Sequence, residues 1–159
     1  MLSNRTPGRT ITSRKPAPHP PVQRTAYLVG RLDRMLRRRI AEVLAPHGLT
    51  VPQYTALSVL SAKSALSNAQ LAERSLISPQ AANEMVKGME ERGWLLREPH
   101  PSHGRILHLK LTVLGAALFA ECDAAVSAVE AELLRDLRPG ERTDLQRMLR
   151  TCFSALTAD

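Results

Sequence analysis

The fold of this chain is decided by residues 67–112, which read SNAQLAERSLISPQAANEMVKGMEERGWLLREPHPSHGRILHLKLT. Ser67 and Gln70 have the spacing of a capping box, in which each side chain satisfies a backbone N–H at the start of a helix. Ser78 followed by Pro79 is a second helix start, because serine caps well and proline is preset for the first turn. The pattern therefore predicts two short helices in succession, joined by a tight turn.

The second of these helices is predicted over residues 78–92 and ends before Gly93, a residue type that stops helices. Two short apolar runs follow, one after Trp94 and one that ends at Leu111, on either side of a loop rich in Pro, His, Ser and Gly. Such a pattern predicts a β-hairpin, and the length of the loop predicts that its tip projects. Two short helices followed by a hairpin are the order of a winged helix-turn-helix, an arrangement used chiefly to hold DNA.

Apolar residues recur at three- and four-residue steps in most of the remaining chain, which favours helices. The expected helices are residues 22–45, a helix opened by a capping box of Thr50 and Gln53, a long helix opened by Thr112, and residues 141–156, after a break at Pro139 and Gly140. The predicted fold class is mainly α with a small β-hairpin wing.

The charge of the chain is concentrated near its start. The formal net charge is +7, yet residues 1–40 carry ten basic residues and one acidic residue, whereas the remainder carries 12 basic and 14 acidic residues. Residues 1–22 are also rich in proline and poor in large apolar side chains, which predicts a disordered arm. A basic arm is typical of proteins that follow a polyanion. A solvated tail without a partner is the alternative interpretation.

Several function classes find no support in the sequence. No apolar run reaches the roughly 20 residues that span a bilayer, and the N-terminus has no apolar signal segment, so a cytoplasmic location is expected. Cys122 and Cys152 are far apart and are both expected to be buried thiols rather than redox switches. His100, His103 and His108 do not have the spacing of a metal site. No set of nucleophile and base, and no phosphate-binding glycine loop, indicates an enzyme or a cofactor.

The second short helix carries polar residues on the side that a DNA-reading helix presents. Leu71, Ala72 and Leu76 are expected to pack the first helix of the pair, and a second apolar set, Ile77, Met85, Val86 and Met89, is expected to hold the reading helix. The outward residues are Ser78, Gln80, Ala81, Asn83, Glu84 and Lys87. Asn and Gln pair with adenine, Glu accepts from cytosine, Ala contacts the thymine methyl group, and Lys suits phosphate. An ordinary solvated helix face is the alternative.

The loop of the hairpin offers His103 and Arg105. An arginine on a projecting loop can insert into the minor groove, where narrow A·T tracts concentrate negative potential. The alternative is a solvated loop arginine.

These segments together resemble the MarR family of bacterial winged-helix regulators, over about residues 24–156. The resemblance is carried by GLTVPQYTALSVL, by QLAERSLISPQAANEMVKGMEERGWLLRE and by the closing LKLT-x-x-G. It implies a homodimer joined by the first and last helices, a reading helix in the major groove and a wing, residues 94–111, in the minor groove. It also implies an effector held between the dimerisation and DNA-binding parts.

The chain departs from the family pattern in three places. The usual Asp-x-Arg of the wing is His103-Gly104-Arg105 here, so Arg105 keeps its place while its usual brace is replaced. Glu84 stands where many relatives carry a basic residue. The first helix carries no cysteine, unlike that of oxidation-sensing relatives.

We therefore expect three parts: a disordered basic arm (1–22), a helical dimerisation region (23–48 and 113–159) and a winged helix-turn-helix DNA-binding domain (49–112). The expected function is a dimeric transcription regulator, a repressor released by a small-molecule effector, bound to a pseudo-palindromic operator in double-stranded DNA. The alternatives are an activator and a winged-helix module that binds proteins rather than DNA. The residues expected to line an effector pocket, unless they are core or interface residues, are Tyr27, His47, Tyr54 and Trp94.

Overall fold

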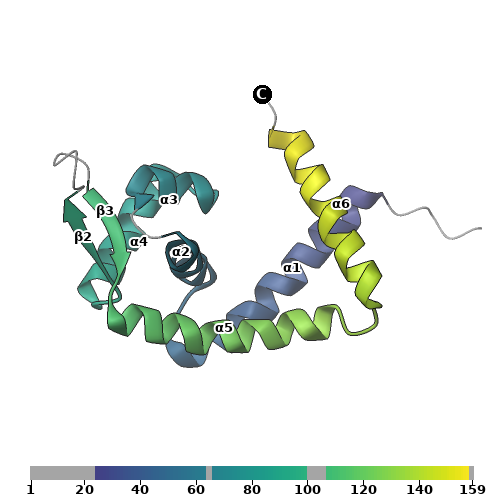
Figure 1. The fold of residues 1–159 in the computed structure, drawn as a ribbon, viewed down its shortest axis with the longest axis horizontal. Helices are drawn as coiled ribbons and strands as arrows, with labels where there is room; N and C mark the ends of the chain where they lie inside the picture. Colours follow the sequence, from purple (N-terminus) through teal and green to yellow (C-terminus); the bar gives the residue numbers. More distant parts are fainter. Residues whose placement is uncertain (1–23, 64–65, 100–106, 158–159) are drawn as a thin grey trace, which may run out of the picture.

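The computed structural model describes residues 24–63, 66–99 and 107–157. One long helix runs between a part that contains the hairpin and a part that contains the last helix (Figure 1). The elements, in chain order, are α1 (Thr25–Leu44), η1 (Ala45–His47), α2 (Val51–Ala62), β1 (Leu66–Ser67), α3 (Asn68–Arg74), α4 (Pro79–Glu91), β2 (Leu95–Pro99), β3 (Leu107–Leu111), α5 (Val113–Leu133) and α6 (Pro139–Thr157). The predicted fold class, mainly α with a small hairpin wing, is confirmed.

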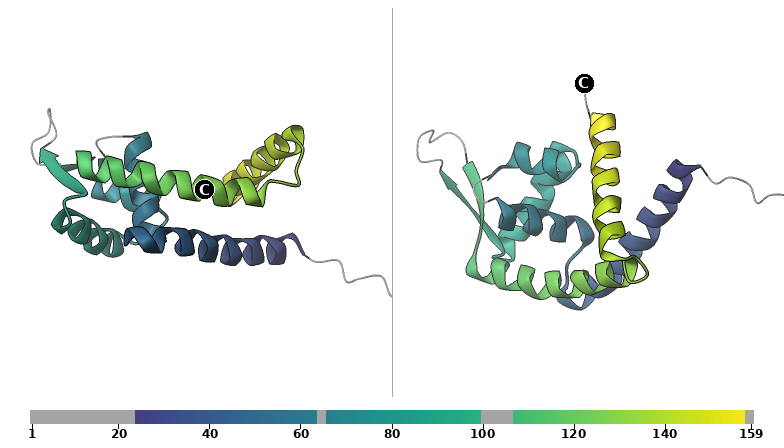
Figure 2. Two further views of the ribbon diagram at one scale, coloured as in Figure 1. Left: turned by 90° about the horizontal axis from the view of Figure 1, so that it is seen from below. Right: turned by 45° about the vertical axis from the view of Figure 1, so that its right-hand side comes forward.

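Helices α2, α3 and α4 and the hairpin gather at one end of α5, and α6 turns back from the other end (Figure 1). Helix α1 packs against α5, which the left view of Figure 2 shows, and α2 also packs against α5. The winged part, residues 51–111, is thus connected to α6 through α5, whereas α1 contacts both α5 and α2.

The predicted helix starts are present as side-chain caps. Thr50 with Gln53 and Ser67 with Gln70 both form complete capping boxes. Thr112 accepts from the backbone N–H of Gly115 at the start of α5. These local bonds satisfy the orphan donors of the first helical turn, which explains why the starts could be predicted from sequence.

Two elements differ from what the sequence predicted. Helix α6 begins at Pro139 rather than after a break at Pro139 and Gly140, because the fixed φ of proline suits the first turn of a helix. A third strand, β1, was not predicted; it pairs antiparallel with β3 and gives the sheet order β1-β3-β2. Two residues are too few to produce a periodic signal, so only the pairing partner reveals this strand.

The core of the described chain lies where α2, α3, α4 and the sheet face the start of α5. It is apolar throughout, and the largest of its fully buried side chains are Leu44, Leu57, Leu66, Leu71, Val86, Met89, Leu109 and Cys122. Leu76 was expected in this core, and that prediction was wrong, since its residue surface is 75% exposed. Its position in the turn after α3 directs it outward.

The two cysteines differ in their surroundings. Cys122 is buried on α5, and burial raises the pKa of its thiol. Cys152 was also expected to be buried, but it is exposed on α6, a helix on which no described residue is buried in the single chain.

No described helix is long and apolar enough to cross a membrane. Within the described ranges, no three His, Cys, Asp or Glu side chains gather closely enough to hold a metal ion.

Candidate nucleic-acid interface

The turn between α3 and α4 is held by three consecutive backbone hydrogen bonds. Ser75, Leu76 and Ile77 donate their N–H groups to the carbonyl oxygens of Leu71, Glu73 and Ala72. Leu76 adopts a left-handed conformation, with φ of 54°. This reversal of the backbone brings α4 across α3 in the manner of a helix-turn-helix.

Helix α4 divides into a buried side and an exposed polar side. Ala82, Val86 and Met89 are buried against the core. The six residues predicted to face DNA are all exposed: Ser78, Gln80, Ala81, Asn83, Glu84 and Lys87. Because the apolar side is fully used in packing, the helix can present this polar row without losing its attachment to the body.

The start of α4 is ordered for contact with an anion or a base edge. Ser78 caps the helix, accepting from the N–H of Ala81 at 3.1 Å. Gln80 donates to Glu84 at 3.4 Å along the same exposed side. Asn83 accepts from Asn68 of α3 at 2.7 Å. The amide of Asn83 is thus oriented before any ligand binds.

The wing is fastened to the C-terminal end of α4. Gly93 has a φ of 70°, its N–H donates to Glu90, and the N–H of Trp94 donates to Met89, which is the Schellman pattern of a helix end. Thr112, at the other end of the hairpin, donates its hydroxyl to the carbonyl of Gly93 at 2.6 Å. Both ends of the hairpin therefore meet where the reading helix stops.

The strands of the wing pair in a regular antiparallel register, with Leu95 opposite Leu111 and Pro99 opposite Leu107. Arg97 of β2 forms an ion pair of 3.0 Å with Glu90 of α4, a second connection between wing and helix. The predicted tip residues His103 and Arg105 lie outside the described residues, as does the arm of residues 1–22.

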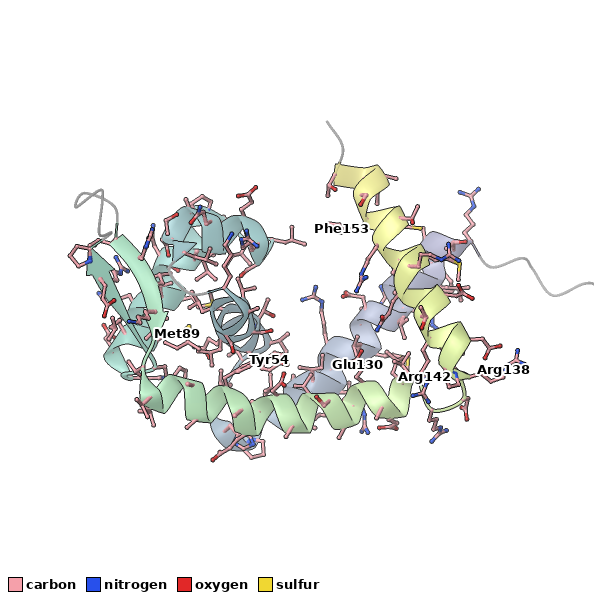
Figure 3. All side chains as sticks on the ribbon, in the orientation of Figure 1. Tyr54, Met89, Glu130, Arg138, Arg142 and Phe153 are labelled. Carbon is pink, nitrogen blue, oxygen red and sulfur yellow. The ribbon has the colours of Figure 1, made fainter. Side chains whose placement is uncertain are left out.

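The four residues expected to line an effector pocket make separate contacts. Tyr54 of α2 donates to Asp123 of α5 at 2.8 Å and stacks on Phe119. Figure 3 shows Tyr54 where α2 faces α5. Burial, followed by the bond to Asp123, raises the pKa of the Tyr54 phenol. This contact joins the winged part to the long helix.

The other three lie elsewhere. Trp94 is 9% exposed, and the guanidinium carbon of Arg92 lies 4.9 Å from the centre of the Trp94 ring. His47 lies 3.7 Å from Glu121, and Tyr27 is exposed on α1.

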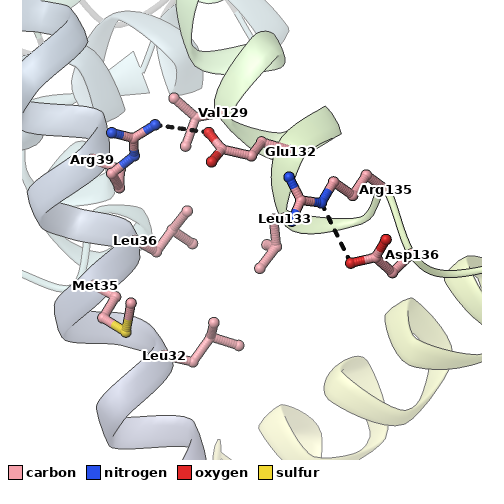
Figure 4. A pocket seen from close by; sticks show the side chains of 9 residues that line it. All are labelled: Leu32, Met35, Leu36, Arg39, Val129, Glu132, Leu133, Arg135 and Asp136. Carbon is pink, nitrogen blue, oxygen red and sulfur yellow. Dashed lines mark hydrogen bonds and ion pairs between the residues drawn. The ribbon is translucent and has the colours of Figure 1, made fainter.

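A cavity of about 260 Å³ lies between α1 and α5, away from all four of those residues (Figure 4). At the edge of this cavity, the guanidinium of Arg39 donates to the carboxylate of Glu132 at 2.8 Å, and this bond lowers the pKa of the Glu132 carboxyl. The residues that line it are Leu32, Met35, Leu36, Arg39, Val129, Glu132, Leu133, Arg135 and Asp136.

Helices α1 and α6 carry more exposed apolar surface than the winged part. These exposed residues are Tyr27, Leu28, Val29, Leu32 and Met35 on α1, and Met148, Leu149, Phe153 and Leu156 on α6. In the single chain these side chains face water, and large exposed apolar surface is typical of sites that bind a partner.

Comparisons with known proteins agree with this arrangement. A family model described as "MarR family" matches residues 47–106. The HTH-type transcriptional repressor Rv2887 of Mycobacterium tuberculosis is 36% identical over 123 residues, which are 77% of this chain and 88% of the relative. The chain belongs to the MarR family, and it is a winged-helix, DNA-binding transcription regulator. Members of this family are homodimers, and the family consists of regulators rather than enzymes.

Two solved structures of Rv2887 extend the comparison. The complex with salicylic acid has a TM-score of 0.68 at 33% identity and covers 83% of this chain and 98% of that chain. The complex with DNA has a TM-score of 0.67 at 31% identity and covers 82% of this chain and 98% of that chain.

Proposed function

We propose that this protein represses transcription by holding a pseudo-palindromic operator as a homodimer, with α4 of each protomer in the major groove. The observation that carries the proposal is the exposed polar row of α4, from Ser78 to Lys87, on a helix whose other side is fully packed. The repressor Rv2887, solved with DNA, supports it.

Each residue of the row has a proposed role. Gln80, Asn83 and Glu84 contact base edges, and Ala81 contacts a thymine methyl group. Lys87 and the capped start of the helix at Ser78 contact phosphate.

The wing and the arm are proposed to add contacts outside the major groove. From its place in the sequence, Arg105 is proposed to contact the minor groove, with His103 beside it. The basic arm, residues 1–22, adds affinity for phosphate without base preference. The two-fold axis is proposed to lie among the exposed apolar residues of α1 and α6, so that residues 23–48 and 113–159 form the dimerisation region and 49–112 the DNA-binding domain.

Release by a small molecule is proposed on the basis of Rv2887, which was solved with salicylic acid. Tyr27, His47, Tyr54 and Trp94 stay the proposed lining of an effector site. We infer that the protein acts in the cytoplasm, where its operator DNA lies. Addition of salicylic acid, used as the probe, should weaken operator binding, and unchanged binding would count against an effector of this class.

Three substitutions test which residues read bases, which contact phosphate and which contact the minor groove. Asn83→Ala should cost about 1–3 kcal/mol of binding free energy and relax the preference at one base pair of each half-site. Lys87→Ala should weaken all sites equally and lower the salt slope by about one unit, since it removes one phosphate contact. Arg105→Ala should weaken operators with A·T flanks most.

The measurement is competition binding of each purified variant against a panel of operator mutants at several salt concentrations. Equal, sequence-blind losses for Asn83→Ala and Lys87→Ala would contradict major-groove reading by α4. The alternative of a protein-binding winged helix would then be favoured.

A further inference from the structure

The atoms that α4 presents to DNA depend on α3 as well. Asn68, the first residue of α3, donates from Nδ2 to Oδ1 of Asn83 at 2.7 Å. Asn83 is exposed in the middle of the polar row, whereas Asn68 is half-buried behind it. No residue of α3 was among those predicted to affect base reading.

The start of α3 is held by the residue before Asn68. This residue, Ser67, caps α3 and accepts from the N–H of Gln70 at 3.2 Å. Ser67 also belongs to β1 and pairs with His108 of β3, a strand of the wing. Asn68 therefore begins α3 directly after a residue that is paired with the wing.

The direction of the Asn68 amide follows from burial. Its Oδ1 is buried and has no hydrogen-bond partner among the described residues. If the amide turned over, an NH₂ group with two donors would replace one acceptor in that buried place. Orphaned buried N–H groups are rarer than under-satisfied oxygens, so the orientation that points Nδ2 at Asn83 is the less costly one.

This orientation decides what Asn83 offers to DNA. Its Oδ1 is engaged by α3, which leaves Nδ2, on the other side of the amide carbon, to face the groove. A free asparagine pairs with adenine through both atoms, by accepting from N6 and donating to N7. A side chain that presents only donors favours bases that show acceptors and no amino donor in the major groove, which are guanine (O6 and N7) and thymine (O4).

We propose that Asn68 is a specificity-determining residue of this regulator, because it orients the amide of Asn83 so that donors face the operator. The inference rests on the proposed reading of the major groove by α4. It places a determinant of base preference on the supporting helix, on a side chain that itself stays behind the reading row.

Asn68→Asp is the sharpest test, because a carboxylate can only accept. Asn83 must then turn its amide and donate to the new carboxylate, so that Oδ1 faces the groove. The preferred base at that position should change from guanine or thymine to cytosine or adenine, which present amino donors, with a change of about tenfold in relative affinity. Asn68→Ala removes the bond without replacing it and should flatten the preference at the same position.

The experiment is selection of operators from a randomised pseudo-palindromic library by the full-length dimer. The position concerned is defined as the one whose preference is relaxed by Asn83→Ala. Ala69→Asp is the matched control, since it adds the same charge at the next, exposed residue of α3 and should weaken all operators alike. Thermal unfolding of each variant verifies that it is folded, and Asn68→Ala carries the test if Asn68→Asp does not fold.

The outcomes separate the two proposals. If Asn83→Ala relaxes no position, major-groove reading by this row is wrong and the inference falls with it. If Asn83→Ala relaxes one position while the Asn68 variants keep the original preference there, the reading function stands and the role of Asn68 is overturned.

Discussion

Leu76 shows at the residue scale how the helix-turn-helix imposes a conformation that its sequence disfavours. The residue has φ of 54°, a region that costs a non-glycine residue about 1–2 kcal/mol because Cβ crowds the following carbonyl. Its side chain is 75% exposed, so burial returns little of that energy. The surrounding turn hydrogen bonds and the packing of α3 on α4 hold the strained residue in place.

The strain predicts an inverted order of stability at this position. Leu76→Gly should be more stable than Leu76→Ala by about 1 kcal/mol, although glycine is normally the less stable of the two in ordered structure. Urea unfolding of both variants at equal protein concentration measures the difference. An alanine variant as stable as the glycine variant would show that the left-handed conformation is not strained in solution.

At the element scale, α4, the wing and α5 meet in a close backbone contact at Gly115. Gly115, in the first turn of α5, lies against the backbone of Trp94, and a methyl group there would overlap the Trp94 carbonyl oxygen. Thr112 lies at the same junction, where its hydroxyl donates to the Gly93 carbonyl and accepts from the Gly115 N–H. The start of the long helix is therefore attached directly to the end of the reading helix.

Gly115→Ala should destabilise the protein by about 1–3 kcal/mol, because the added methyl group can be accommodated only if α5 moves away from Trp94. Gly88→Ala is the control, since Gly88 lies within α4 and a methyl group there meets no atom within 4 Å. That substitution should stabilise by about 0.5–1 kcal/mol through helix propensity. Thermal unfolding measures both, and a neutral Gly115→Ala would contradict the close approach.

At the scale of the whole molecule, α5 carries the winged part at one end and packs beside α1 along its length (Figure 2). The bond between Tyr54 and Asp123 and the ion pair between Arg39 and Glu132 lie at different points along this helix. With the proposed dimer interface on α1 and α6, a change in how two protomers pack would reach the reading helices through α5.

The exposed apolar row of α6 predicts where the dimer can be broken. Phe153→Glu should shift the chain from dimer to monomer at micromolar concentration and weaken operator binding, since one protomer offers a single reading helix. Ser154→Glu places the same charge on the far side of the apolar row and should leave the dimer intact. Sedimentation velocity distinguishes the two species. A stable Phe153→Glu dimer would place the interface elsewhere.

Much of the fold could be predicted because its signals are local. The caps at Thr50, Ser67, Ser78 and Thr112 satisfy donors within the same turn, so residues a few positions apart define where each helix starts. The exposed side of α4 was predicted for a similar reason, as helical periodicity alone separates its apolar residues from its polar ones.

The order of the helices and the polar row of α4 could be predicted from the sequence because each depends on neighbours within one or two turns, and the hairpin could be predicted because two short apolar runs flank a turn-rich loop. The strand of Leu66 and Ser67, the outward direction of Leu76 and the orientation of Asn83 by Asn68 became apparent only in the folded chain. The strand and the bond to Asn83 join residues of different elements that are 15 or more positions apart, and no periodicity within one segment reports on such a partner. Hydrogen bonds of that kind depend on how α3, α4 and the wing meet, which is set by the packing of the whole domain.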